Sequence, residues 1–172
     1  KLPLAEIVRN LDKSMAADPG STFVYNSGVT MLLGEILEQL TGQTIADYAE
    51  AELFRPLGID AHYWKLTPTG LADVEGGLYL APADLAKIAA LYMHDGEWNG
   101  RRIVPASWIG ESLVPATRST YPGNEVLRKA GYGFQWWIYS DYLGQTAYGG
   151  SGYGGQYPVA VPGLDLVVVF TS

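Results

Sequence analysis

The sequence predicts an α+β fold in which a mainly helical region, residues 1–113, precedes an antiparallel sheet in residues 131–172. In the first half, apolar residues recur at helical spacing, and Leu, Ala and Glu are frequent. From Gly131 onward, Gly, Tyr and Trp concentrate and apolar residues alternate as they do in strands. The 172 residues suffice for one domain of ordinary size, so we expect a single segment of one fold.

The first half contains several helix signals. Apolar residues at helical spacing predict an amphipathic helix near the N-terminus, and a second helix has a clearer stripe that ends before Gly42, a residue suited to a left-handed cap. Thr44 and Asp47 form a capping box for a third helix, which Pro56 should end. The apolar positions of the first two helices are Leu4, Ile7, Val8, Leu11 and Met15, then Val29, Leu32, Leu33, Ile36, Leu37 and Leu40.

The middle of the chain alternates loops and helices. Residues 67–77 are rich in Thr, Gly and Pro and predict a loop. Pro82 suits the first turn of a helix that Asp95 and Gly96 should close. Pro105 should open one more short helix that runs through Leu113.

The last third predicts strands. The run from Leu164 to Thr171 is dense in Val and is expected to be a well-buried strand, connected to the strand before it by a tight turn at Pro162 and Gly163. Upstream, the alternating apolar residues are Phe134, Trp136, Ile138, Val159 and Val161.

Composition excludes several classes of partner and cofactor. The formal charge is −7 and no basic run occurs, so nucleic acid is not an expected partner. Cysteine is absent, and His62 and His94 lack metal-ligand spacing, so we expect no metal site. The glycine-rich loops that bind phosphates and dinucleotides are absent too, and we expect no cofactor. No stretch predicts a signal peptide or membrane insertion, and both an exported and a cytoplasmic location remain open.

Two polar clusters lie in apolar surroundings. The first precedes the strongest helix: Asn26 or Ser27 could cap that helix, whereas capping leaves Tyr25 unexplained. A tyrosine at a helix start could serve as a general base. The second cluster, residues 148–156, has five glycines beside a predicted strand. Its exposed backbone N–H groups could form an oxyanion hole, or the segment could be a glycine-rich hairpin.

Together these segments resemble the class C β-lactamase-like group, which includes β-lactamases, family VIII esterases, D-aminopeptidases, DD-peptidases and 6-aminohexanoate-dimer hydrolases. The resemblance covers nearly the whole chain and implies a partial β-lactamase/transpeptidase-like fold. Five matching segments occur in the family's order: Pro19–Gly34, Pro56–Ile59, Gly76–Ala86, Gly131–Trp137 and Gly152–Val169.

The resemblance also implies roles for individual residues. Tyr25 matches the tyrosine that helps move the proton of the nucleophile and protonates the leaving group, and Ser27 stands where the family usually has Asn. Gly150, Ser151 and Gly152 match the third motif, commonly Lys-Thr-Gly or His-x-Gly, and the missing cation favours an esterase or peptidase over a β-lactamase. The backbone N–H of Tyr153 would form half of the oxyanion hole.

The family's nucleophile is absent from the sequence. No serine has Lys three residues later, so the Ser-x-x-Lys motif is missing, and both ends of the chain look cut. We therefore expect part of a serine hydrolase that acts on an ester, amide or peptide through an acyl-enzyme, with this segment inactive alone. We also expect Tyr25 to lie within reach of residues 150–153.

Two other interpretations remain open. The chain could be a non-catalytic penicillin-, peptide- or glycan-binding relative that uses its aromatic side chains for recognition. It could also self-associate, or bind the missing half of the fold, through strand edges; we expect the Leu164–Phe170 strand to be buried in such an interface. The aromatic candidates for recognition are Trp136, Trp137, Tyr148, Tyr153 and Tyr157.

Overall fold

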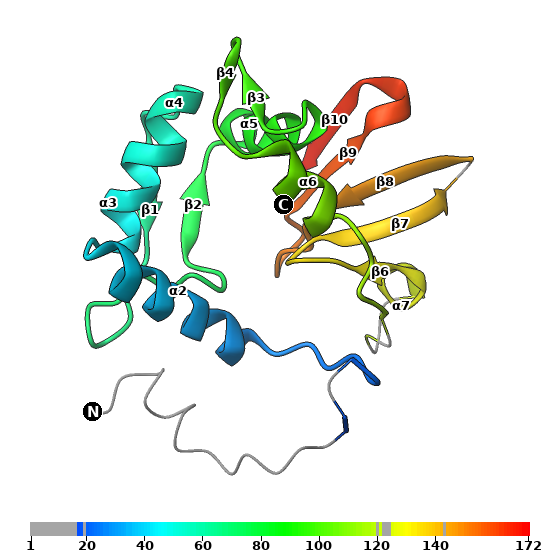
Figure 1. Cartoon of the computed structure of the whole chain (residues 1–172), viewed down its shortest axis with the longest axis horizontal. Helices are drawn as coiled ribbons and strands as arrows, with labels where there is room; N and C mark the ends of the chain where they lie inside the picture. The colour runs from blue at the N-terminus through cyan, green and yellow to red at the C-terminus, as the bar shows by residue number, and fades with distance from the viewer. Residues whose placement is uncertain (1–16, 19, 120, 122–124, 143) are drawn as a thin grey trace. The chain divides into compact units, whose positions relative to one another are not determined.

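A computed structural model describes residues 17–172 except 19, 120, 122–124 and 143. The helix predicted from Leu4 to Met15 lies outside the described residues. The described chain divides into two compact units: residues 25–81 form one, and residues 17–24 with 82–172 form the other. Figure 1 shows the course of the chain, and each unit is described by itself.

The first unit is built mainly from helices. Helix α2 spans Ser27–Thr41 and ends at Gly42, whose φ of 69° confirms the predicted left-handed cap. Helix α3, Ile45–Ala49, begins with the predicted capping box: the Thr44 hydroxyl accepts from the Asp47 N–H and donates to the Asp47 carboxylate. The chain continues through a π-helical turn, Glu50–Phe54, into α4, Arg55–Leu57.

The third predicted helix ends slightly later than expected. Pro56 lies inside the last turn, and the helix ends after Leu57. Gly58, with φ of 64°, turns the chain in the left-handed region and donates its N–H to the Arg55 carbonyl. Because the left-handed backbone suits glycine, Gly58 rather than Pro56 ends the helix.

Helix α2 packs through a narrower face than its apolar pattern indicated. Met31 and Gly34 are buried, and the Gly34 backbone lies against the Val74 side chain of the following loop. Half or more of the accessible area remains exposed on Val29, Leu33, Ile36 and Leu40. The helix is thus apolar on an outer face as well as on its packed face.

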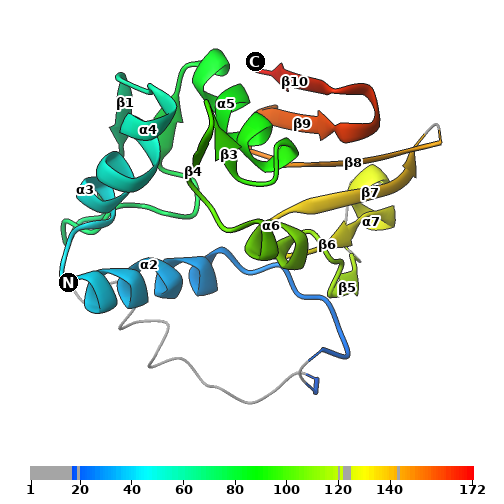
Figure 2. The same cartoon turned by 45° about the horizontal axis from the view of Figure 1, so that its top comes forward.

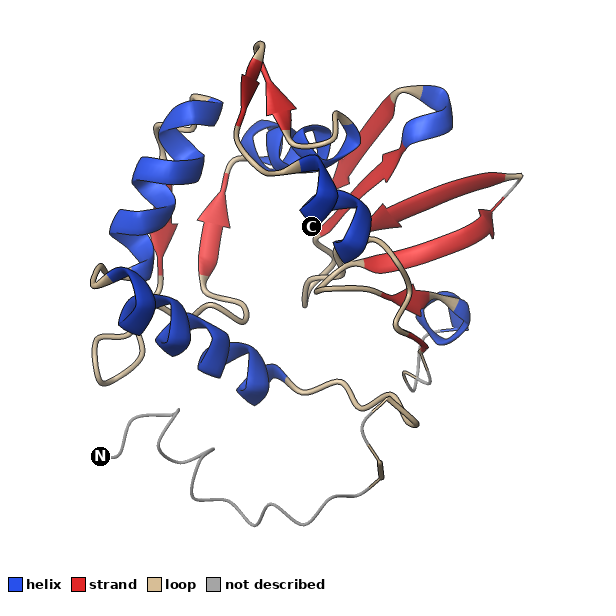
Figure 3. Cartoon of the chain, in the orientation of Figure 1, coloured by secondary structure: helices blue, strands red, loops and turns tan. Residues whose placement is uncertain are grey.

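Two short strands complete the first unit. Strand β1, His62–Trp64, pairs antiparallel with β2, Leu78–Leu80, and the predicted loop at residues 67–77 connects them. The sequence pattern did not predict either strand. Figure 3 draws both strands in red beside the blue helices of the first unit.

The second unit contains the sheet. It begins with α5, Pro82–Met93, confirmed with its predicted closure at Asp95 and Gly96, whose φ values are positive. A small hairpin follows, β3 (Glu97–Trp98) with β4 (Arg101–Arg102), and then α6, Ala106–Ser112, with Pro105 at its start as predicted.

A six-stranded antiparallel sheet has the order β10-β9-β8-β7-β6-β5 and confirms the predicted fold class. Helix α5 packs against β9 and β10, as Figure 2 shows. Between this helix and the sheet lies a core cluster of four buried residues, Ala89, Ile138, Tyr148 and Ala160. The remaining elements are β5 (Thr117–Arg118), α7 (Glu125–Lys129), β6 (Gly131–Tyr132), β7 (Trp137–Tyr142), β8 (Gln145–Gly149), β9 (Tyr157–Val161), a 3₁₀ turn (Pro162–Leu164) and β10 (Leu166–Phe170).

The prediction that the last strand is well buried was wrong. Strand β10 is an edge strand, and the exposed fractions of Leu166 and Phe170 are 42% and 59%. Alternate side chains explain this: Val167 packs with the α5 cluster, while its neighbours point to the opposite face. The expected interface at this strand stays a prediction.

Candidate active site

Tyr25 lies in an extended segment directly before α2. Asn26, with extended φ and ψ of −146° and 101°, is the N-cap, and its side-chain oxygen accepts from the Val29 N–H at 3.3 Å. Asn26 therefore caps the helix, and Ser27 is its first residue. Tyr25 is 43% exposed at this helix start.

The second cluster forms the connection between β8 and β9. Gly150 donates its N–H to the Pro158 carbonyl at 3.0 Å, and Gly152 donates to the Gln156 carbonyl at 2.8 Å. Beyond Gly149 the regular strand ends, and Gly152 and Gln156 form an isolated bridge. Of the two alternatives that the sequence left open, the local structure is thus the glycine-rich hairpin, which follows directly on β8.

This hairpin presents the backbone of Tyr153. The Tyr153 side chain is fully exposed, and no described residue accepts a hydrogen bond from its N–H. Gly154 and Gly155 follow with φ of 82° and 96°, so the chain turns sharply beyond it. A backbone donor on a tight turn, not used by the fold, can stabilise an oxyanion.

Close packing between β8 and β9 requires glycine at the start of the hairpin. A Cβ at Gly149 would lie 2.2 Å from the Pro158 carbonyl oxygen, which accepts the Gly150 N–H. At Gly150 it would lie 3.2 Å from the Pro158 ring. A side chain at Gly150 would therefore require a small shift of the Pro158 ring.

Aromatic side chains beside the hairpin are mostly part of the core. Trp137 and Tyr148 are almost fully buried, and Trp136 packs edge-on against Tyr148 with ring centroids 5.5 Å apart. Tyr153 and Tyr157 are exposed. Core packing thus accounts for three of the five aromatic residues considered for recognition.

The Tyr148 hydroxyl is buried and has no hydrogen-bond partner among the described residues. Burial, followed by the negative charge of Asp95, raises the pKa of Tyr148 far above its ordinary value of 10.0. Burial likewise raises the pKa of Tyr139, on the neighbouring strand, to about 12. Both tyrosines are therefore structural at neutral pH and unsuited to act as bases.

We expect Tyr148→Phe to raise the free energy of unfolding by about 1 kcal/mol at pH 8, because it removes an unsatisfied buried hydroxyl. The folded-state pKa lies above the unfolded value, so the wild type should lose stability as pH rises above 10.0, and the advantage of the variant should grow there. Urea unfolding at pH 8 and 10.5 measures both effects. A variant that is less stable at both pH values would show that the hydroxyl is satisfied.

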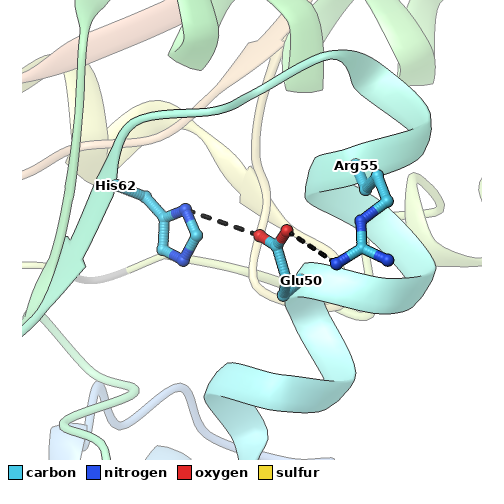
Figure 4. Close-up of polar contacts among 3 residues, drawn as sticks. All are labelled: Glu50, Arg55 and His62. Atoms are coloured by element: carbon cyan, nitrogen blue, oxygen red, sulfur yellow. Dashed lines mark hydrogen bonds and ion pairs between the residues drawn. The ribbon is translucent and has the colours of Figure 1, made fainter.

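The two histidines contact carboxylates, in keeping with structural roles. His62 Nδ1 lies 3.7 Å from Glu50 Oε2, whose other oxygen lies 3.3 Å from the Arg55 guanidinium, as Figure 4 shows. The His62 ring packs on Phe54 with centroids 4.6 Å apart. His94 Nε2 lies 3.8 Å from Asp165 Oδ1 on the surface. Among the described residues, no cluster of acidic and His side chains could hold a metal ion.

Each candidate cluster is built within one unit. Tyr25 and Ser27 belong to the first unit, and Gly150, Ser151, Gly152 and Tyr153 to the second. Their approach across the two units stays a prediction. One further feature of the second unit escaped the sequence pattern: Phe134, expected in a strand, lies in the tight turn between β6 and β7, at the same end of the sheet as Tyr153.

Comparison with known proteins identifies the family. The model of the Beta-lactamase family matches residues 5–172, and the chain belongs to this family. The 6-aminohexanoate-dimer hydrolase of Paenarthrobacter ureafaciens is 26% identical over 154 residues, which cover 87% of this chain and 39% of that protein. The chain therefore spans well under half the length of this curated relative.

Solved structures agree on the fold. The octameric penicillin-binding protein homologue from Pyrococcus abyssi superposes with a TM-score of 0.79 and 25% identity, covering 98% of this chain and 44% of that one. The D-stereospecific amidohydrolase from a Streptomyces species gives a TM-score of 0.66 at 16% identity, covering 89% and 51%. No described helix is long and apolar enough to cross a membrane.

Proposed function

We propose that this chain contributes the proton-transfer tyrosine and one oxyanion donor to a serine hydrolase that cleaves an ester or amide bond. The supporting observation is the Beta-lactamase family match across residues 5–172, with Tyr25 at the start of α2 and the Tyr153 N–H unused on its turn. The Ser-x-x-Lys nucleophile is absent from the 172 residues and would come from another part of the protein.

In this mechanism the serine hydroxyl attacks the carbonyl carbon of the substrate. The phenolate oxygen of Tyr25, stabilised by the lysine of Ser-x-x-Lys, accepts the serine proton, and the carbonyl oxygen becomes an oxyanion that accepts from the Tyr153 N–H. Tyr25 then protonates the leaving oxygen or nitrogen as the carbonyl–heteroatom bond breaks. Water attacks the acyl-enzyme in the second half of the reaction, and the serine regains its proton.

The residues near the oxyanion donor indicate the substrate class. Gly150 supplies no positive charge, and a Cβ at this position would lie 3.2 Å from the Pro158 ring. The Ser151 hydroxyl can donate and accept hydrogen bonds, but it carries no charge that would neutralise a carboxylate. We therefore favour neutral esters, amides or peptides over β-lactams that carry a carboxylate.

A serine-directed fluorophosphonate probe tests this proposal. We expect it to label the Ser-x-x-Lys serine in a longer protein that contains both that motif and this sequence. The 172-residue chain alone should stay unlabelled and should not hydrolyse nitrocefin or short p-nitrophenyl esters above background. Stoichiometric labelling of Ser27 or Ser151 would contradict the assignment. A longer protein that binds penicillin without turnover would favour the non-catalytic binding relative.

A further inference from the structure

We infer that Trp108 and Phe134, named here the aromatic shelf, bind an aryl group of the substrate beside the Tyr153 oxyanion donor. The role of the shelf in substrate hydrolysis rests on the proposed function. The binding itself can be tested without turnover. Both residues and the Tyr153 turn belong to the same unit, so their arrangement is described by the structure.

The shelf is exposed although it consists of two large aromatic side chains. The exposed fractions of Trp108 and Phe134 are 46% and 43%. Their ring centroids lie 5.4 Å apart at an interplanar angle of 44°. The aromatic clusters around Trp137 and Tyr148, in contrast, are buried in the core. The shelf therefore leaves ring surface available to a ligand, as aromatic linings of small-molecule sites do.

Three local constraints hold Phe134 against Trp108. Phe134 donates its N–H to the Ser112 carbonyl, at the end of α6, at 2.9 Å. Gly133 approaches the same carbonyl so closely that a Cβ would lie 2.2 Å from its oxygen. Gln135 adopts φ of 66°, a conformation that costs strain in a residue other than glycine. The turn is thus positioned by specific contacts and is not a loosely placed loop.

The sheet places this turn at the same end as the hairpin that carries the Tyr153 N–H. In an antiparallel meander, alternate connections lie at the same end of the sheet. The first residue of β7, Trp137, pairs with the last residue of β8, Gly149. The β6–β7 turn that carries Phe134 and the β8–β9 hairpin that carries Tyr153 therefore extend from adjacent strands, which lie about 5 Å apart.

This juxtaposition indicates the ligand. A carbonyl bound by the Tyr153 N–H would have an apolar aromatic surface at the neighbouring turn and no fixed charge from Gly150, Ser151 or Gly152. An ester or amide that carries an aryl group near its carbonyl fits both features. Stacking against an aromatic pair typically strengthens binding by about 2- to 12-fold.

Binding to the 172-residue chain tests the shelf with two unreactive amides, N-phenylacetylglycinamide and N-acetylglycinamide. Titrations followed by ¹H–¹⁵N NMR should give a Kd for the phenyl compound about 2- to 12-fold lower, the range expected for one aromatic contact. Trp108→Ala and Phe134→Ala should abolish this preference, and Trp108→Phe should retain most of it. Circular dichroism verifies that each variant is folded.

The matched control is Tyr63→Ala, which removes one ring of another exposed aromatic pair, Tyr63 with Tyr79 at 5.6 Å. It should leave the preference unchanged. Equal affinity for both amides in the wild type, or a preference lost equally in Tyr63→Ala, overturns the inference. The amide titrations do not depend on the proposed function. If the proposed function is wrong, the Ser-x-x-Lys serine of the longer protein stays unlabelled by the fluorophosphonate probe.

Discussion

Replacing Tyr25 by phenylalanine should lower kcat by about 10²- to 10⁴-fold in a longer protein that carries this sequence together with Ser-x-x-Lys, the usual contribution of a positioned acid–base group. The ring is kept and only the hydroxyl is lost, so the fold and KM should change little. Steady-state hydrolysis of p-nitrophenyl esters measures the effect. The change tests chemistry because Asn26, and not Tyr25, caps α2.

Two control variants separate this effect from local structure. Asn26→Ala removes the helix cap, should cost about 1 kcal/mol of stability, and should lower kcat far less than Tyr25→Phe. Tyr79→Phe removes the hydroxyl of an exposed tyrosine of the same unit and should leave kcat unchanged. A wild-type kcat for Tyr25→Phe would remove Tyr25 from the mechanism.

The second large effect is expected for Gly149→Ala, which should lower the free energy of unfolding by about 3 kcal/mol and Tm by about 6–12 °C. The added Cβ would lie 2.2 Å from the Pro158 carbonyl oxygen, so β8 and β9 must separate where the Gly150 N–H bond forms. Urea unfolding and calorimetry measure the loss. Because the Tyr153 turn depends on this pairing, the amide binding described above should weaken as well.

Gly110→Ala is the matched control, because the same glycine-to-alanine change is expected to raise the stability instead of lowering it. Gly110 lies within α6, and a Cβ there would meet no atom within 4 Å. Alanine should stabilise this helix by up to about 1 kcal/mol. Equal stability changes in the two variants would show that close packing at Gly149 does not decide the outcome.

Helices with local signals could be predicted from the sequence. The Asn26 and Thr44 caps, the left-handed Gly42, and Pro82 at the start of α5 all act within a few residues, so the sequence pattern locates them. Strands β1 and β2 could not be predicted, because each has three residues and pairs with a partner about sixteen residues away. Pairing of this kind depends on contacts that a local pattern does not contain.

Burial was the property that the sequence pattern predicted least well. The Val-rich run ending at Phe170 indicated a buried strand, but it lies at the sheet edge, where Val167 packs toward α5 while Leu166 and Phe170 are exposed. The stripe of α2 is also largely exposed at Leu33 and Ile36. Apolar periodicity states which face could be buried, whereas the neighbouring elements decide whether it is.

The residues of the candidate site followed from the sequence, and their local geometry did not. Tyr25 and the glycines near Tyr153 could be recognised because motif chemistry resides in residue type and order. Only the tertiary structure shows that residues 150–153 form a hairpin, that Pro158 enforces glycine at position 149, and that Phe134 lies on the adjacent turn. Strand pairing determines these features, because it brings together groups that the chain separates by many residues.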